Sequence, residues 1–283
     1  NVGTEISPPF SSSYHIYRLA GERPQTREIL HSIPCTNRAS PFWLHSFGLT
    51  RNKVVIIEQP AEYDVPAMLG LSAASHGSID WKASLGTRVH VYDRMTGTHT
   101  SHTVEPAFFF FHIANAFDTP DGGVCLDVCM FEDPEIVTAL RLDRLTDDAL
   151  ARDLPSSRLT RLSVPGDGRS PPTMQPVDDK TVTGEFMDLP SISSDAAGRA
   201  DYRYAFGIGA ARPTVVSNRL VKVDVSGKGG GRVFELPGML PGEPLFVPRP
   251  GGETEDDGVL LAMGTDADGG SSLYVLDAKE MGL

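Results

Sequence analysis

The stretch TRVHVYDRMTGTH, residues 87–99, shows how this chain is built. A run rich in β-branched and aromatic residues ends in a short turn of Asp, Thr and Gly, and β-forming residues follow the turn. This pattern predicts a β-hairpin. A second turn of this kind, DVSGKGGGR at residues 224–232, follows another β-rich run. Repeated hairpins closed in this way favour the blades of a β-propeller.

Short β-rich stretches bounded by Gly, Pro, Asp or Ser recur outward from this hairpin in both directions. Apart from the hairpin strand, they cover residues 12–20, 41–50, 53–60, 107–117, 123–131, 157–165, 201–209, 218–225, 232–238, 243–250, 258–266 and 272–278. Residues 133–150 have apolar positions at helical spacing and are the best helical candidate. Residues 70–78 and 166–181 are typical of loops. The sequence therefore predicts an all-β sandwich, barrel or propeller, although no clean 40-residue repeat is visible.

The composition narrows the classes of partner. The formal net charge of −12 opposes binding to a phosphate backbone, so we expect no nucleic-acid partner. The three cysteines have no CxxC spacing and are expected to be buried, reduced thiols, which favours an intracellular, reducing compartment. No apolar run approaches the ~20 residues of a membrane-spanning helix. The chain starts at Asn1 and stops soon after a strand, so we expect an internal piece of a longer protein.

Two histidines lie among aromatic residues. His112 follows four phenylalanines in AFFFFHIANAFD, residues 107–118, and on a strand it shares a face with Phe108 and Phe110. His45 alternates in the same way with Trp43 and Phe47. Each histidine, taken alone, is also explained as a core residue with a buried partner. The other six histidines lie in polar or alternating contexts and are expected to be ordinary surface or sheet residues.

Five motifs in the same order resemble those of the carotenoid cleavage oxygenases. They are WLHSFGLTRNKVVIIEQP, FHIANAFD with VCLDVCMFED, DLPSIS with YRYAFGIG, EPLFVPRPGGETEDDGVLLAMGTD, and LYVLDAKEM. The N-terminal NVGTEI and YHIYRLAG are most similar to the branch of β-carotene 15,15′-oxygenase and the retinoid isomerohydrolase of the eye. The resemblance covers nearly the whole chain.

The resemblance implies a seven-bladed β-propeller with one Fe(II) ion, Fe2+, on its axis, held by four histidines. His45 matches the family histidine of the HSFG(L/M)T motif, and His112 matches that of FHxxNA. The other two ligands would lie outside this chain. Residues 1–283 would then be one propeller domain that is incomplete at both ends, and this piece alone is expected to be inactive. Neutral imidazoles suit ferrous iron and leave coordination positions for O2.

Acidic residues of the family accept the outer N–H of the iron-bound histidines, which orients the rings. Glu243 matches one of them, and we expect it to be buried behind the iron. Asp188 stands where the family has Glu, and its side chain is one methylene shorter. Glu185 is an alternative at this place. The aromatic residues Trp43, Phe47, Phe108 and Phe110 would contribute to an apolar substrate tunnel.

The implied activity is Fe(II)- and O2-dependent cleavage of a double bond in a carotenoid or apocarotenoid, giving aldehyde or ketone products such as retinal. The alternatives are isomerisation of a retinoid ester on the same metal and a non-catalytic propeller used for binding. The protein would be cytoplasmic or peripheral to a membrane, or in a plastid if it comes from a photosynthetic organism. Residues 64–74, DVPAMLGLSAA, would lie at the tunnel mouth and contact a lipid surface.

Overall fold

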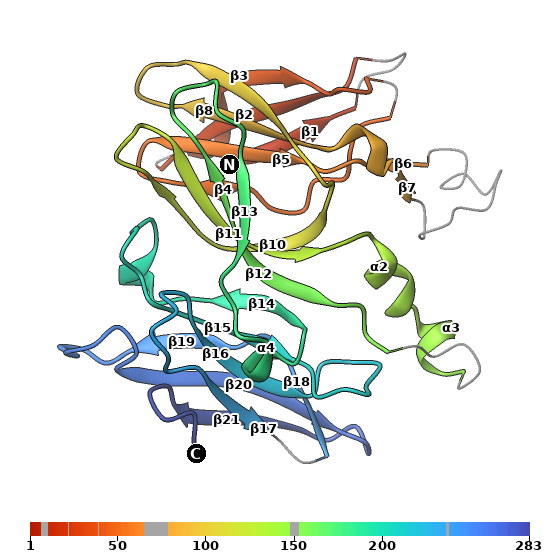
Figure 1. Ribbon diagram of the computed structural model, residues 1–283, viewed down its shortest axis with the longest axis vertical. Helices are drawn as coiled ribbons and strands as arrows, with labels where there is room; N and C mark the ends of the chain where they lie inside the picture. Colours follow the sequence, from red (N-terminus) through yellow and green to blue (C-terminus); the bar gives the residue numbers. More distant parts are fainter. Residues whose placement is uncertain (7–10, 22, 39, 65–78, 148–152, 236–237) are drawn as a thin grey trace. The chain divides into compact units, whose positions relative to one another are not determined.

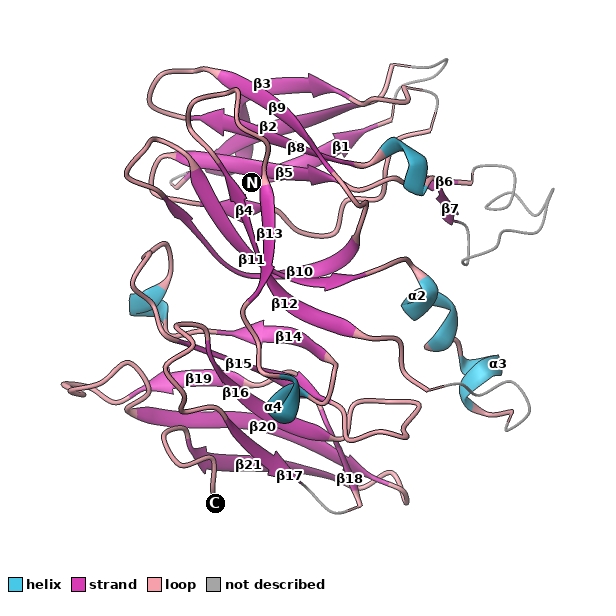
Figure 2. Ribbon diagram, in the orientation of Figure 1, coloured by secondary structure: helices cyan, strands magenta, loops and turns pink. Residues whose placement is uncertain are grey.

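In the computed structural model, strands dominate the chain and the few helices are short (Figure 2). The structure describes residues 1–6, 11–21, 23–38, 40–64, 79–147, 153–235 and 238–283. The chain divides into two compact units, Asn1–Phe109 and Phe110–Leu283. Each unit consists of antiparallel sheets, and most neighbouring strands follow one another in the chain, as the predicted hairpins require (Figure 1).

The first unit contains three sheets. One has the order β1-β2-β3, a second has the order β4-β5-β8-β9, and a third consists of β6 and β7. Their bounds are Val2–Glu5 (β1), Ser13–Ala20 (β2), Arg23–Pro34 (β3), Gly48–Leu49 (β4), Lys53–Glu58 (β5), Ala61–Tyr63 (β6), Ile79–Trp81 (β7), Thr87–Asp93 (β8) and His99–Val104 (β9), with a 3-10 helix at Ala83–Leu85. The predicted hairpin is confirmed, since β8 and β9 pair from Thr87↔Val104 to Tyr92↔His99.

The second unit contains three sheets of four strands, and its first strand begins at the boundary between the units. The strands are Phe109–Asp118 (β10), Val124–Phe131 (β11), Ser157–Val164 (β12), Thr173–Pro176 (β13), Met187–Ser191 (β14), Tyr204–Gly209 (β15), Arg219–Asp224 (β16), Arg232–Glu235 (β17), Met239–Pro241 (β18), Leu245–Pro248 (β19), Gly258–Asp266 (β20) and Ser271–Asp277 (β21). The helices are Glu135–Ala139 (α2), Leu142–Leu145 (α3) and Lys180–Thr183 (α4), with a 3-10 helix at Ser194–Ala196.

Three expectations about local structure need correction. The helix expected over 133–150 is two short helices, α2 and α3, because the chain leaves the helix at Leu140 and starts a new turn after Arg141. The loop expected over 166–181 contains β13, whose main chain pairs with β12. The strand expected over 41–50 is reduced to β4 and an isolated bridge between Phe42 and Glu62.

The middle strands of the second unit are apolar on both faces. Every residue of β11 and β15 is buried, and side chains of the β10–β13 and β14–β17 sheets form one hydrophobic core cluster. The sheet of β18–β21 is different, since buried residues alternate with more open ones along β20 and most residues of β21 are exposed. Its buried face stacks Phe246 on Phe206 of the preceding sheet, with ring centroids 5.2 Å apart.

The opposite face of the β18–β21 sheet is apolar and exposed. Leu245, Leu261 and Val275 form one row across β19, β20 and β21, and Met263 and Leu273 form the next row. Leu245, Met263, Leu273 and Val275 are each more than half exposed. This face is therefore a one-sided sheet surface of the kind that normally packs on another layer.

Candidate metal site

The strand that decides the site is β10. The run of four phenylalanines at its start, residues 108–111, is mostly interior, because Phe108, Phe109 and Phe110 are buried. The histidine that follows them, His112, keeps 29% of its side chain exposed. A strand that begins in the core thus brings an imidazole to a partly open position.

The asparagine of the same motif has a structural role. Asn115 is buried, and its Oδ1 accepts hydrogen bonds from the backbone N–H groups of Ala116 and Gly198. Its Nδ2 donates to the carbonyls of Ala196 and Arg199. The side chain therefore ties β10 to the loop after β14 and fixes the strand three residues beyond His112.

His112 is hydrogen-bonded to Asp188 on β14. The distance from its Nδ1 to Asp188 Oδ1 is 2.8 Å. The carboxylate is buried, and the same oxygen accepts a hydrogen bond of 2.9 Å from the backbone N–H of Leu189. Although Asp is one methylene shorter than the Glu of the family motif, its carboxylate reaches the ring.

The hydrogen bond selects one form of the imidazole. A carboxylate accepts only, so Nδ1 carries the proton and a neutral ring has its lone pair on Nε2. This is the arrangement in which a histidine ligates a metal through one nitrogen while a carboxylate orients the ring through the other. The chemistry of this pair therefore fits a divalent metal ligand.

Cys129 lies in the same core. It is fully buried, and burial raises the pKa of its thiol well above the usual range, with the charge of Asp188 adding to the effect. All three cysteines are free and buried, as expected from the sequence. A neutral thiol here is a packing group beside the carboxylate.

Glu185 takes no part in orienting the ring. Its side chain forms an exposed ion pair of 2.8 Å with Lys180, which lowers the pKa of its carboxyl. The structure thus assigns the contact with His112 to Asp188, the residue in the family position.

The expectation that Glu243 is buried is wrong. Glu243 is exposed and lies in the gap between β18 and β19, which pair one after the other with the same edge of β20. Pro244 beside it is buried, so the chain turns its ring inward and the carboxylate outward. This exposure counts against a role for Glu243 behind a metal.

His45 lies in the irregular segment before β4 and is exposed. Its ring contacts Trp43, with centroids 5.3 Å apart, and Trp43 stacks on Phe109 at 5.5 Å. Phe47 does not continue this wall, because it packs with Leu44 against the core cluster around Tyr14. The tunnel roles of Trp43, Phe47, Phe108 and Phe110 stay a prediction.

His45 belongs to the first unit and His112 to the second, and their sharing of one metal ion stays a prediction. In the part of the chain that the structure describes, no group of three or more His, Cys, Asp or Glu side chains is arranged to hold a metal.

A second cluster of histidines was missed by sequence reasoning. His90 is buried on β8, with its Nε2 3.1 Å from Glu58 Oε2 and its Nδ1 3.2 Å from His99 Nε2. His31 stacks on Tyr92 and touches the ring of His99. The residues come from β3, β5, β8 and β9, so no sequence spacing joins them. The valines on either side of His90 face the other side of β8, so they gave no signal of its burial.

The carboxylate of Glu58 and the ring of His99 in this cluster have shifted pKa values. Burial alone would raise the pKa of Glu58, but hydrogen bonds from His90 and Thr36 outweigh it, and the pKa is lowered. Burial lowers the pKa of His99 to about 4, and the neighbouring His90 and His31 contribute. The cluster thus holds an ionised carboxylate and a neutral His99 at pH 7.

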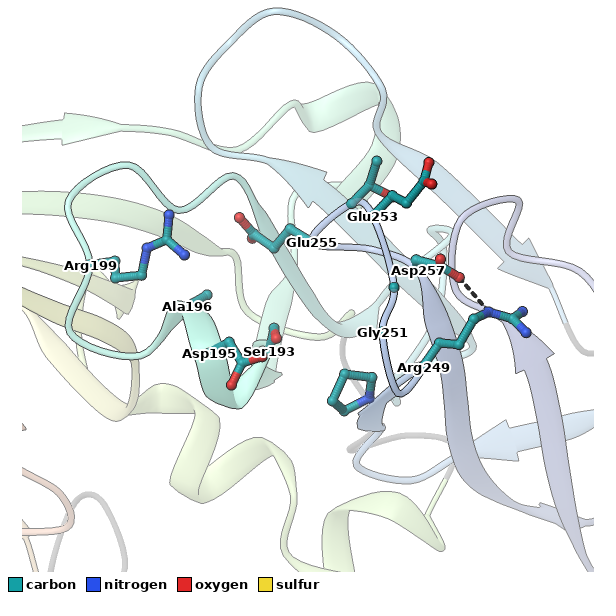
Figure 3. Close-up of a pocket in the computed structure, with 12 residues that line it drawn as sticks. Ser193, Asp195, Ala196, Arg199, Arg249, Gly251, Glu253, Glu255 and Asp257 are labelled. Atoms are coloured by element: carbon teal, nitrogen blue, oxygen red, sulfur yellow. Dashed lines mark hydrogen bonds and ion pairs between the residues drawn. The ribbon is translucent and has the colours of Figure 1, made fainter.

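A surface pocket of about 480 Å³ lies in the second unit, between the loop after β14 and the loop between β19 and β20 (Figure 3). It is lined by Asp195, Glu253, Glu255 and Asp257, and Asp257 pairs with Arg249 at 2.7 Å. None of its lining residues is a predicted site residue, and its charged walls do not suit a polyene.

Of the predicted lipid-contacting segment 64–74, only Asp64 is among the described residues, so that prediction lies outside what the structure describes. Among the residues with a described position, none belongs to a helix long and apolar enough to cross a membrane.

Comparison with known proteins identifies the class. The chain matches the family model of the retinal pigment epithelial membrane protein, RPE65, over residues 1–283. It resembles the crystal structure of cobalt-substituted Synechocystis ACO with a TM-score of 0.77 at 24% identity, covering 99% of this chain and 55% of that one. The fold is therefore that of a partial β-propeller.

The curated relatives are carotenoid-cleaving dioxygenases, in agreement with the family model. The chloroplastic carotenoid cleavage dioxygenase 8 of Arabidopsis thaliana is 34% identical over 275 residues, which cover 94% of this chain and 48% of the relative. The β,β-carotene 15,15′-dioxygenase of Rattus norvegicus is 29% identical over 321 residues, covering 99% and 55%. The chain belongs to the RPE65 and carotenoid cleavage oxygenase family, and it spans about half the length of the curated relatives it matches.

Proposed function

We propose that residues 1–283 are part of an Fe(II)- and O2-dependent oxygenase that cleaves a carbon–carbon double bond of a carotenoid or apocarotenoid to carbonyl products. The observation that carries the proposal is the 2.8 Å hydrogen bond between His112 Nδ1 and Asp188 Oδ1. The names of the dioxygenase relatives support the substrate class.

His112 and His45 would be the two iron ligands contributed by this chain, within one propeller domain that is incomplete at both ends. Asp188 would hold the ring of His112 in the tautomer that ligation needs, because it accepts a hydrogen bond from Nδ1–H. Glu243 is the weaker part of the proposal because of its exposure. When bound, ferrous iron would supply the site at which O2 is activated.

The other contribution of this chain is apolar surface. A polyene offers no hydrogen-bonding groups along its length, so its position is fixed by shape and by the exclusion of water. Trp43, packed on the buried Phe109 and next to His45, provides aromatic surface beside a ligand. We propose this stack as one wall of the substrate site.

The test uses the full-length protein, loaded with Fe(II) under nitrogen and then exposed to O2 with β-carotene or an apocarotenal. We expect iron-dependent formation of two carbonyl products, with label from 18O2 in both. Retinyl ester isomerisation without O2 uptake would instead support the isomerohydrolase alternative. Purified, iron-loaded protein that transforms neither class would overturn the proposal and leave a binding propeller.

A further inference from the structure

A buried serine holds the backbone beside the carboxylate. Ser157 is the first residue of β12 and is fully buried. Its Oγ donates to the carbonyl of Met187 at 2.8 Å and accepts from the N–H of Met187 at 3.0 Å. One hydroxyl thus satisfies both main-chain groups of the residue that precedes Asp188.

The position of Met187 explains why these bonds matter. β14 is the first strand of its sheet and pairs only with β15 in the described ladder, where Met187 lies opposite Gly209. The main-chain groups of alternate residues on such a strand point away from the partner. Because Met187 is fully buried, water cannot satisfy them. Ser157 replaces the missing neighbour at this residue alone.

The backbone on the other side of Asp188 is also constrained. The ladder has one extra residue on β14 between Asp188 and Ser191, which is a β-bulge. Leu189, inside the bulge, has a φ of 48°, in the left-handed region that disfavours a leucine by about 1–2 kcal/mol. Bulges re-aim side chains. Asp188 thus lies between the residue held by the Ser157 hydroxyl, an arrangement called here the hydroxyl clamp, and the bulge. Its carboxylate is hydrogen-bonded to His112.

The first unit contains a counterpart of the clamp. Thr87 is the first residue of β8, the third strand of its sheet, as Ser157 is of its own. The Thr87 hydroxyl is buried, accepts from the N–H of Phe108 at 3.1 Å and lies 3.4 Å from its carbonyl. Phe108 immediately precedes β10. In both cases a hydroxyl on the third strand of one sheet therefore holds the backbone where the first strand of the next sheet begins.

We infer that Ser157 is a positioning residue for His112: its hydroxyl fixes the peptide before Asp188 and thereby keeps the carboxylate on Nδ1 of the ring. The inference deepens the proposed function and rests on it only for the statement that His112 serves a metal. The hydrogen-bonded chain from Ser157 to His112 lies within the second unit and is independent of the reaction catalysed.

The experiment follows the tautomer of His112 in the 283-residue chain labelled with 15N-histidine, by long-range 1H–15N correlation at pH 7.5. The His112 signals are assigned with His112→Gln. In the wild type we expect the pattern of an Nδ1–H ring. Ser157→Ala should move the two nitrogens towards tautomer-averaged values, as should Asp188→Asn, whereas Ser157→Thr should keep the wild-type pattern because Thr87 makes the same contacts with a threonine.

Thr87→Val is the matched control. It removes an equivalent hydroxyl, so it should lower the unfolding midpoint as Ser157→Ala does, yet leave the His112 pattern unchanged. If Ser157→Ala lowers stability but leaves the tautomer fixed, the positioning role is wrong and Ser157 only satisfies the strand edge. Should Ser157→Ala not fold, Ser157→Cys keeps the volume with weaker hydrogen bonds and must show the same shift, or the inference fails.

The full-length protein separates this inference from the proposed function. Ser157→Ala should weaken Fe(II) binding by about 10-fold, in the range found for groups behind metal ligands, with KM for the polyene unchanged. A wild-type protein without oxygenase activity but with the expected tautomer shifts would refute the function and keep the positioning role. If the protein is active but Ser157→Ala changes neither its iron affinity nor the tautomer of His112, the positioning role alone is refuted.

Discussion

His112 in the second unit and His90 in the first each bond a carboxylate, but the two histidines are set differently. The Nδ1 of His112 meets Asp188, and 29% of the side chain is exposed. Both ring nitrogens of His90 are taken by protein groups, Glu58 at Nε2 and His99 at Nδ1, and its side chain is 5% exposed.

The difference teaches that a histidine–carboxylate pair alone does not mark a metal site. A ring whose two nitrogens are both hydrogen-bonded inside the protein has no lone pair to offer a metal and acts as a structural connector. The ring of His112 is oriented at Nδ1 by Asp188 and lies at a partly open position. We therefore expect substitutions at the His90 cluster to affect stability and those at the His112 pair to affect metal binding.

The largest effect is expected from Glu58→Ala. The buried carboxylate accepts from the buried ring of His90 and, at the edge of the core, from the hydroxyl and the N–H of the exposed Thr36. Its removal leaves the buried ring nitrogen of His90 and two part-buried donors of Thr36 without their acceptor, so the free energy of unfolding should fall by about 3 kcal/mol. Chemical denaturation measures this. The Fe(II) affinity of the folded full-length variant should stay at the wild-type value. A lower affinity would contradict the distinction between the His90 cluster and the His112 pair.

Asp188→Ala should show the converse. Without the acceptor at Nδ1 the ring of His112 can rotate and change tautomer, so the Fe(II) affinity of the full-length protein should fall by about 10–100-fold. Competition with a fluorescent chelator measures the affinity. A variant that binds iron as tightly as the wild type would show that the contact between Asp188 and His112 is structural, like that of His90.

The pH dependence sharpens the comparison further. His99 titrates near 6.5 in an unfolded chain, and its folded pKa is about 4. The unfolded state therefore binds more protons between these values, so the contribution of His99 to stability is complete above pH 6.5 and is lost as the pH falls towards 4. Urea midpoints measured from pH 7 to 4 should decline, and His99→Gln should flatten the decline. A curve for His99→Gln that matches the wild type would contradict this assignment.

Glu185→Gln should have the smallest effect. The exposed pair with Lys180 is screened by water, so the unfolding midpoint and the Fe(II) affinity should both match the wild type within error. Thermal scans and the same chelator competition check this. A loss of iron affinity in this variant would move the orienting role from Asp188 to Glu185.

The sequence predicted the strands of this fold better than its irregular parts. Short β-rich runs bounded by Gly, Pro, Asp or Ser located β5, β8, β10 and β20, because the burial of these strands is visible in the local sequence. β14 was not predicted as a strand, since its Asp, Pro and bulge obscure the pattern, and its place depends on Ser157 from another sheet. The edge strand β13 was taken for a loop because its side chains are polar and largely exposed.

Part of the site was also accessible from the sequence. His112 and Asp188 were found because their motifs match the family, and the structure brings them together. The exposure of Glu243 could not be foreseen, because it depends on how the chain crosses from β18 to β19 along one edge. The His90 cluster joins four strands, and only the three-dimensional pairing reveals it.

The apolar face of the β18–β21 sheet has a consequence for how the protein is made. Leu245 on β19 and Leu273 and Val275 on β21 are each more than half exposed. While nothing covers this face, it is an adhesive surface on a newly made chain and a natural target for chaperones. Yield in cells should therefore respond to polar substitutions on this face, even where the substitutions leave the folded sheet intact.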